Sequence, residues 1–380
     1  MSAAQWRRAM HSAQALSARQ ATAAQGAALH ASAAPADPRA APPWRRPNTA
    51  RWPWAHGLLA VLLLLYPLMA TPFFVYQIGA QSLALGLIAL SLTFLGGYGG
   101  MVSLSQMTVA GMTGYLLAIL GHSSMASISL GWPWWLAAPL AMLAAVLLAT
   151  LVGWLSIRTE GIHTIMITLA VGVAFFYLAQ QNYALFNGFQ GFSKIEAPTV
   201  GEVDFREPVP FYYLCVACAG LAYAAVVYLV RAPFGIALQG IRDNPRRMAA
   251  LGFDVAAHRL MAHAMAGLLA ALGGVLLLWY NHRISPGSVN TGAMLNILII
   301  AVLGGMRHPI GAFLGALVFV LLQNFAIDLV DRQRFNLLIG AVFILIVFVS
   351  PDGLLGLGQA WRERRRRRRA GAPGPSGRAH

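Results

Sequence analysis

Charge is scarce in this chain. Only 10% of its 380 residues are charged, whereas 58% are hydrophobic, so the polar surface that a soluble fold exposes to water is missing. This composition excludes a soluble domain and predicts an integral membrane protein. The net charge of +15 is compatible with nucleic-acid binding, but the basic residues fall in tails and loops instead of on one globular face. We therefore exclude nucleic acid as a partner.

Lysine and cysteine are almost absent. The single lysine, Lys194, is preceded by GFQGFS and followed by Ile195, whereas a phosphate-cradling loop needs GxxxxGK followed by Ser or Thr. The chain is therefore predicted not to be an enzyme, because it lacks an ATPase site of this kind. Cys215 and Cys218 lie three residues apart in an apolar run, a spacing typical of helix packing instead of metal or redox chemistry. No metal or cofactor is predicted in this chain.

Long apolar runs fill the chain between its tails. Each is close to the roughly 20 residues that a helix needs to cross about 30 Å of hydrocarbon. The sequence thus predicts an all-α polytopic membrane protein with about ten transmembrane helices, of which the second, third, eighth and ninth are candidates for broken or re-entrant segments. The runs are 57–76, 78–97, 101–120, 132–155, 162–182, 208–230, 260–280, 289–306, 309–327 and 335–351.

Ionisable residues are missing from these runs. They contain no Asp, Glu, Lys or Arg, and His163 and His263 are their only histidines. Proton-driven carriers usually keep an acidic residue or a relay at membrane depth, so the pattern argues against an ion-coupled carrier. The two histidines are interpreted as packed or interfacial side chains, with a proton relay as the alternative.

The distribution of basic residues predicts the orientation. With both termini in the cytoplasm, 22 of the 27 Lys and Arg fall on the cytoplasmic side and five on the outer side, while the 12 acidic residues divide evenly. This asymmetry satisfies the positive-inside rule. We expect a multi-pass protein of the bacterial inner membrane.

The chain is predicted to have three regions. Residues 1–53 form a disordered basic cytoplasmic tail, with an organellar transit peptide or an over-extended start as alternatives. Residues 54–357 form the transmembrane domain. Residues 358–380 form a second basic cytoplasmic tail, whose run Arg364 to Arg369 is expected to attract anionic lipid; a regulatory or nucleic-acid role would need more than these six arginines.

Glycine clusters interrupt two pairs of runs. LGGYGGMVSLSQMTVAGMTGY covers residues 95–115, and LGGMRHPIGAFLGAL covers residues 303–317. Such segments let the backbone break where it is buried by protein or lines a water-filled path, or else they allow close helix packing. The two clusters are six crossings apart, which suggests an internal repeat. The predicted helix breaks are at Gly304, Gly305, Gly311 and Gly315.

The stretch from Arg231 to Arg259 is the only long charged segment between apolar runs. Asp243 or Asn244 is predicted to cap a helix that has Pro245 in its first turn and Gly252 at its end. This helix of roughly two turns would carry Arg246 and Arg247 at a membrane face. A solvated cytoplasmic loop that only fixes topology is the alternative.

Four blocks of this sequence resemble a known family. They are GGYGGMVSLSQ (96–106), PFGIALQGIRDNPRRMAALGFD (233–254), VLGGMRHPIGAFLGA (302–316) and SPDGLLGL (350–357). On these blocks the chain resembles the permease subunits of branched-chain amino-acid ABC importers, and 54–357 would be the permease domain. The resemblance implies a multi-pass permease that works with partner ATPase subunits carrying ATP and Mg²⁺, a second permease subunit in a homodimer or heterodimer, a periplasmic substrate-binding protein and the lipid bilayer.

The resemblance also implies that 231–259 is the coupling loop. Its short helix would sit on an ATPase subunit, with Met248 and Leu251 buried there and the arginines setting the register. The predicted ATPase-contact positions are Gly240, Arg242, Asp243, Asn244, Arg246, Arg247, Ala249, Ala250, Leu251 and Gly252.

A substrate pathway is predicted along two polar stretches. A zwitterion with an apolar side chain can pass an uncharged lining if helix ends and freed backbone groups meet its charges. The predicted lining is Gly99, Gly100, Ser103, Ser105, Gln106, Thr108, Asn187, Gly188, Gln190 and Gly191. The acidic residues of the 183–210 loop are candidates for docking the binding protein. The alternative is that this loop is only a solvated connection.

Departures from the family pattern leave the substrate open. Gln106 stands where the family usually has His, and Gln190 stands at an acidic position. Urea, short amides and aromatic or organic acids therefore remain alternatives to branched-chain amino acids. An ion-coupled carrier, a passive channel and a structural scaffold are alternatives of other classes.

Overall fold

The structure is a computed structural model that describes residues 53–159, 161–329, 340–341, 344 and 353–356. The predicted tails and the tenth apolar run lie wholly or mostly outside these residues, as do Ser350, Pro351, Asp352 and Leu357 of the fourth family block. The described residues from Ala60 onward belong to one compact unit. Helix α2 (Pro53–Met69) begins ahead of that unit.

The described part of the chain is mostly helical, with short strands confined to loops. Its first half contains α2, α3 (Pro72–Phe74), the π-helical turn η2 (Val75–Ala80), α4 (Gln81–Thr93), a second π-helical turn η3 (Phe94–Tyr98), α5 (Gln106–Leu120), α6 (Trp134–Ser156), α7 (Ile162–Gln181) and α8 (Tyr183–Phe186). Next come the 3-10 turn η4 (Gly188–Gln190), β1 (Phe192–Ser193), β2 (Thr199–Val200), β3 (Val203–Asp204) and α9 (Pro208–Arg231). The remaining elements are α10 (Pro233–Asp243), α11 (Pro245–Ala250), α12 (Val255–Asn281), β4 (Arg283–Ile284), the 3-10 turn η5 (Pro286–Val289), α13 (Thr291–Gly304) and α14 (Pro309–Leu329).

The described residues do not confirm ten crossings. Five helices there are long and apolar enough to span a membrane: Pro72–Tyr98, α6, α7, α9 and α12. The pair α13 and α14 adds a sixth if it counts as one span, because the two helices are bent by 117° at their break. The third predicted run, 101–120, becomes the 15-residue helix α5, since residues 101–105 are not helical.

The first two predicted runs have the wrong boundary. The apolar runs 57–76 and 78–97 predict a division near residue 77, but α2 ends at Met69 and one continuous helix extends from Pro72 to Tyr98. Thr71 is extended at ψ 153° because the ring of a following proline disfavours helical backbone at the residue before it. Pro72 then occupies the first turn of the new helix, where its missing N–H costs nothing.

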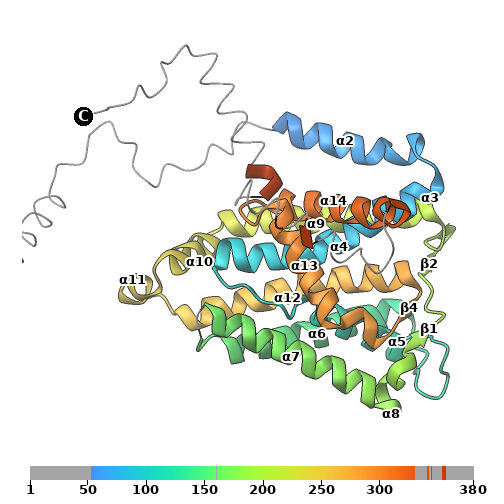
Figure 1. Cartoon of the computed structure of the whole chain (residues 1–380), viewed down its shortest axis with the longest axis horizontal. Coiled ribbons are helices and arrows are strands. Elements are labelled where there is room, and N and C mark those ends of the chain that lie inside the picture. The colour runs from blue at the N-terminus through green and yellow to red at the C-terminus, as the bar shows by residue number, and fades with distance from the viewer. Residues whose placement is uncertain (1–52, 160, 330–339, 342–343, 345–352, 357–380) are drawn as a thin grey trace, which may run out of the picture. The chain divides into compact units, whose positions relative to one another are not determined.

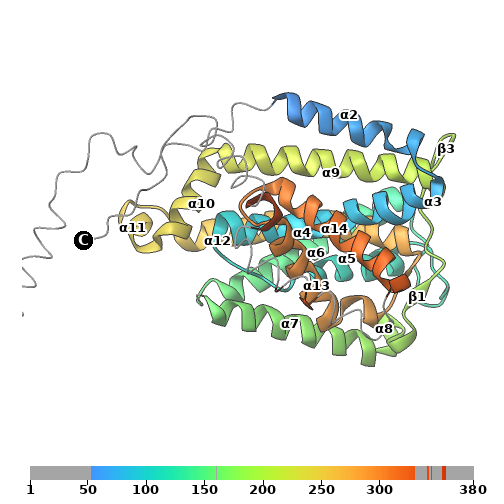
Figure 2. The same ribbon diagram turned by 45° about the horizontal axis from the view of Figure 1, so that its top comes forward.

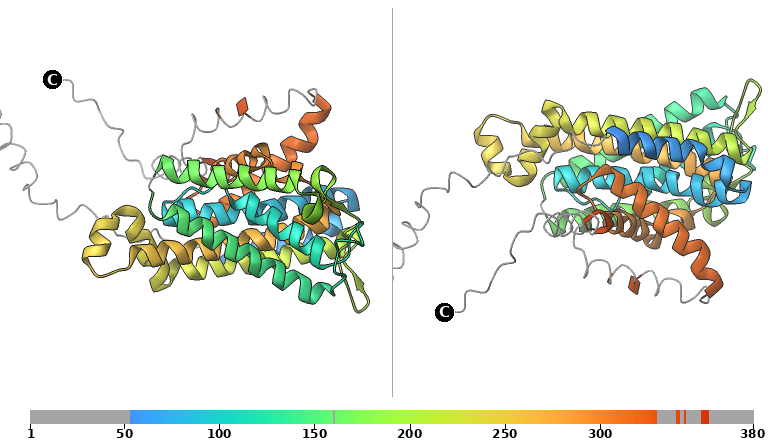
Figure 3. Two further views of the ribbon diagram at one scale, coloured as in Figure 1. Left: turned by 90° about the horizontal axis from the view of Figure 1, so that it is seen from below. Right: turned by 90° about the horizontal axis from the view of Figure 1, so that it is seen from above.

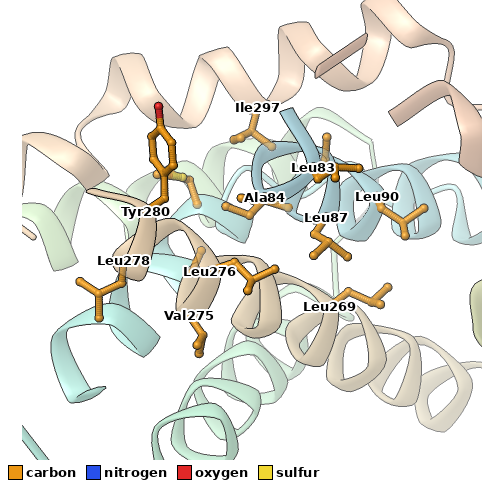
Figure 4. Packing of buried hydrophobic residues seen from close by; sticks show 14 of the residues in the cluster. Leu83, Ala84, Leu87, Leu90, Leu269, Val275, Leu276, Leu278, Tyr280 and Ile297 are labelled. Carbon is orange, nitrogen blue, oxygen red and sulfur yellow. The ribbon is translucent and has the colours of Figure 1, made fainter. Parts of the chain in front are cut away.

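Helix α4 lies at the centre of the packing. In the most apolar window of Pro72–Tyr98, 89% of the residues are buried inside the protein, compared with 22% for α9. Figure 4 shows Leu83, Leu87 and Leu90 of α4 close to Leu269 and Leu276 of α12. Helix α9 lies on the periphery beside α4 and η2 (Figure 2), so most of its apolar surface is left for lipid.

Two glycines bring α13 and α14 together at their bend. A Cβ atom on Gly304 would lie 1.8 Å from the carbonyl oxygen of Gly311, a separation that only glycine permits. The chain turns at Gly305, whose φ is +101°. These residues produce a sharply bent, apolar helical pair.

The two ends of the helices carry different structures (Figures 1 and 3). At one end, which we call the α11 end, α10 and α11 follow α9, and the ring of Phe234 stacks on His258 near the start of α12. At the opposite end, which we call the β1 end, β1 pairs with β4 and β2 pairs with β3, both antiparallel. Ser124 donates its N–H to Ser193 O at 2.9 Å and thereby ties the loop after α5 to β1.

A tyrosine compensates for a proline inside α2. Pro67 has no N–H, so it leaves the carbonyl of Leu63 without its usual helical donor. The hydroxyl of Tyr212 on α9 donates to Leu63 O at 2.9 Å, and Tyr213 donates to Leu64 O at 3.2 Å. A carbonyl without a donor is costly in hydrocarbon, so these bonds stabilise the contact between α2 and α9.

A double-mutant cycle tests this compensation. We expect Tyr212→Phe to lower the free energy of unfolding in detergent by about 1 kcal/mol, since the Leu63 carbonyl loses its donor. In a Pro67→Ala background the new N–H bonds that carbonyl, so the same substitution should cost clearly less. Equal losses in both backgrounds, measured by thermal unfolding, would contradict the pairing.

Candidate coupling and translocation site

The segment after α9 folds into two short helices. Helix α10 was missed in the sequence analysis, whereas the predicted capped helix is present as α11. Asn244 is extended between them, at φ −157° and ψ 94°, and its side chain accepts the N–H of Arg247 at 2.9 Å. Gly252 has φ +90° and closes the far end. The residues therefore form a rigid corner instead of an irregular loop.

The tip of this corner is apolar and exposed. Leu251 is 67% exposed and Phe253 is 41% exposed, next to exposed Ala249 and Ala250. Met248 instead packs back towards α10. A Cβ atom on Gly240 would lie only 2.8 Å from the Met248 sulfur. Leu251 and Phe253 are thus the large apolar side chains that this tip offers to a partner.

Arg242 is a predicted contact residue whose guanidinium instead turns towards η3, which follows α4. Its Nη1 donates to the carbonyl of Gly97, and its Nε donates to Asp243 Oδ1 at 3.0 Å. Its side chain is still 39% exposed. By contrast, Arg246 and Arg247 lie on the exposed surface of α11.

The first predicted group of pathway residues forms a buried polar cluster where α5 begins. Ser91 Oγ lies 3.0 Å from Gln106 Oε1, and Ser103 Oγ lies 2.9 Å from Ser105 Oγ. The N–H of Leu104 donates to Thr168 Oγ1 on α7 at 3.1 Å. The hydroxyl of Thr108 is buried and has no hydrogen-bond partner among the described residues. Gly99 is also buried, whereas Gly100 is exposed.

Thr108 faces the junction of α5 with α7 and α13. A Cβ atom on Gly172 would lie 2.9 Å from Thr108 Oγ1 and 2.7 Å from the sulfur of Met294. A buried hydroxyl without a partner is costly, and this one lies in the first turn of α5, where free N–H groups give a positive partial charge. Thr108 is therefore a buried hydroxyl without a described partner, next to the free N–H groups of a helix start.

The second predicted group packs elsewhere. Asn187 has φ +57° and donates from Nδ2 to Gly191 O at 2.6 Å. Gly188 lies against the ring of Tyr183, and Gly191 lies against the backbone of Ile284 and Ser285. Gln190 is exposed in η4. This group closes the β1 end of α7, so the structure does not join it to the cluster around Thr108.

Aromatic side chains lie between these two groups. Tyr115, further along α5, is fully buried, and its ring packs edge to face against Phe175, Phe186 and Phe192 at centroid distances of 6.1, 5.2 and 6.3 Å. These residues, like Ser91 and Thr168, are not among the predicted site residues. Aromatic and hydroxyl side chains are ordinary in apolar helices, so no sequence signal marks them.

The basic side chains of the described residues are concentrated at the α11 end. That end has Arg158, Arg231, Arg242, Arg246, Arg247, Arg259 and Arg307, with Asp243 and Asp254 as its described acids. The β1 end has Lys194, Arg206 and Arg283, with Glu196, Glu202, Asp204 and Glu207. Arg206 forms an ion pair with Glu196 at 2.7 Å. Among the described residues, the α11 end therefore carries a net positive charge and the β1 end does not.

These features define a class: a multi-pass helical membrane protein with a buried neutral polar cluster, two glycine-rich breaks and a projecting capped helix. Comparison with known proteins gives the family. Residues 74–347 match the family described as "Branched-chain amino acid transport system / permease component", and the chain belongs to it. The predicted resemblance is confirmed.

Several curated relatives carry different substrate names. The high-affinity branched-chain amino acid transport system permease protein LivM of Escherichia coli is 24% identical over 324 residues, which cover 78% of this chain and 74% of LivM. The LivM of Salmonella typhimurium matches equally well. The ribose import permease protein RbsC of Haemophilus influenzae is 23% identical, over 79% of this chain and 91% of RbsC. No solved structure gives a significant match.

Proposed function

We propose that this chain is the membrane-spanning subunit of an ATP-driven importer, and that α11 docks on a partner ATPase. The observation that carries the proposal is the capped helix α11, with Leu251 and Phe253 exposed beside it. Such side chains at a charged, water-facing end are well suited to the apolar groove of a second protein. The predicted contact set from Gly240 to Gly252 belongs to this proposal, apart from Arg242, whose side chain turns inward to the Gly97 carbonyl.

The orientation follows from the charges. The α11 end has most of the described arginines, which favours the cytoplasmic side, and the β1 end then faces the periplasm. This orientation would give ATPase subunits, with their ATP and Mg²⁺, access to α11. Both termini would be cytoplasmic in a bacterial inner membrane. A second permease subunit, identical or related, would complete the membrane part.

We further propose that substrate arrives at the β1 end from a periplasmic binding protein. The acidic residues of the 196–207 loop offer charges that can set the register of such a partner. Substrate would pass to the cluster where α5 begins, whose neutral hydroxyls and helix N-terminus suit the carboxylate of a zwitterion. ATP binding would move α11 and switch the opening from one side to the other.

Branched-chain or other hydrophobic amino acids are the proposed substrates. The LivM relatives support this class, and the buried cluster has no charged side chain among its described residues. Related permeases for ribose and guanosine make a sugar or nucleoside the alternative. Urea, short amides and aromatic or organic acids remain alternatives from the family resemblance.

Docking can be tested at Leu251. We expect Leu251→Asp to remove a co-encoded ATPase from the purified complex, because a carboxylate would be buried in an apolar contact. Val200→Asp, at an exposed apolar position of the β1 end, is the matched control and should retain the ATPase. If no ATPase binds the unchanged protein, the proposed ATP-driven function fails and a channel or ion-coupled carrier must be reconsidered.

The pathway can be tested at Thr108. We expect Thr108→Val to lower uptake of radiolabelled L-leucine by the assembled transporter about tenfold, as expected when one hydrogen bond to substrate is lost. Stability should not fall, since Thr108 Oγ1 has no described partner to lose. Thr113→Val is the control, because the Thr113 hydroxyl already bonds Val109 O within α5. If Thr108→Val and Thr113→Val lower uptake equally, the proposal that Thr108 lies in the substrate pathway is wrong.

A further inference from the structure

Three segments that are distant in sequence meet around Arg242. This residue lies in the last turn of α10, immediately before the corner that leads into α11. Its guanidinium bonds the Gly97 carbonyl in η3, and its stem packs on Gly100 in the turn that follows η3. Gly97 also packs against Met306 at the bend between α13 and α14. Arg242 thus contacts the first glycine-rich break, which in turn contacts the second.

The contact with Gly97 satisfies a helix end. The helical backbone stops at Tyr98, so the last carbonyls of Pro72–Tyr98 lack following helical N–H groups. A cationic donor at a helix C-terminus both bonds a free carbonyl and complements the helix dipole. Arg242 does this from another segment, so the position of the helix end depends on the position of α10.

The stem of Arg242 packs on the same turn. Gly100 has φ +68°, and a Cβ atom there would lie 2.5 Å from Arg242 Cγ. Backbone and side chain therefore touch with no space for a larger residue. The turn is held by both the guanidinium and the stem, which makes the connection stiff.

The third segment is the bend after α13. A Cβ atom on Gly97 would lie 1.9 Å from the carbonyl oxygen of Met306, and the hydroxyl of Tyr98 donates to Arg307 O at 3.3 Å. The end of η3 and the bend before α14 are thus in direct contact. A displacement of one must be accommodated by the other, because packed backbone has no void to absorb it.

We propose that Arg242 is a positioning residue that transmits movement of α11 to the start of α5 and to the α13–α14 bend. This inference rests on the proposed function and changes the predicted role of one residue, since Arg242 then acts inside the permease instead of at the ATPase surface. Helix α10 would carry this movement as a rigid body. It is joined to α9 through Ala232, which is extended at ψ 160°, and it ends at the corner with α11. Movement of α11 would then pull on the Gly97 carbonyl.

The test follows the turn itself, so it does not depend on knowing the substrate. A single cysteine replaces Val102, which is partly buried in the turn, in a chain whose Cys215 and Cys218 are changed to Ser. The full complex with its ATPase is assembled in proteoliposomes. The rate of maleimide labelling at position 102 is measured with and without a non-hydrolysable ATP analogue.

We expect the analogue to change the labelling rate several-fold when Arg242 is present. Arg242→Gln should abolish this change while the ATPase still co-purifies, and Arg242→Lys, which keeps the charge but lacks the planar fork, should retain part of it. Arg158→Gln is the matched control, because Arg158 is an exposed arginine after α6 that lies outside the predicted contact set, and it should respond like the parent. If Arg242→Gln does not fold, Arg242→Lys provides the test: a smaller nucleotide-dependent change in labelling than in the parent supports the proposal, and an equal change contradicts it.

Other outcomes would overturn the proposal. An unchanged nucleotide response in Arg242→Gln, or no response in the parent complex, would show that Arg242 does not transmit movement to this turn. Loss of the ATPase from Arg242→Gln would return the residue to the docking surface. Failure of the parent to bind any ATPase would instead refute the proposed function, and the inference with it.

Discussion

One constraint shapes this protein: a backbone polar group in hydrocarbon needs a partner from the protein itself. At three interruptions of the described helices, another segment supplies that partner. Tyr212 bonds the carbonyl that Pro67 leaves free, Thr168 accepts the N–H of Leu104 at the start of α5, and Arg242 bonds the last turn before Gly99. Each interruption therefore fixes a contact between segments that are distant in sequence, and these contacts hold the fold together.

The same interruptions give the protein its candidate functional parts. Continuous helices such as α6 and α12 pack as scaffold, whereas the short helix α5 begins inside the protein, next to hydroxyl groups that carry no charge. The bend after α13 depends on the close approach of Gly304 and Gly311. Because packed helices tend to have two discrete arrangements instead of deforming smoothly, a small shift at the turn after Tyr98 can alter the surroundings of Thr108. The proposed coupling uses this arrangement.

The sequence predicts the helical class, the family and the capped helix α11, since long apolar runs, Asn244, Pro245 and Gly252 act locally. It does not predict which runs are separate spans. Residues 72–98 form one helix and α5 is short, because Pro72 and the glycine turn act against the hydropathy pattern. The inward side chain of Arg242 and the aromatic contacts of Tyr115 depend on partners more than 50 residues away along the chain, so local pattern contains no sign of them. The predicted pathway residues fall into two separate groups for the same reason.

The central claim is that α11 contacts an ATPase, and cross-linking tests it most directly. A cysteine is placed at Leu251, with Cys215 and Cys218 changed to Ser, and a short bifunctional reagent is added to membranes that contain the whole transporter. The account predicts a cross-linked product with the ATPase subunit from position 251, and none from a cysteine placed at Val200 on the β1 end. A product with the ATPase from Val200 and none from Leu251 would contradict both the docking surface and the orientation.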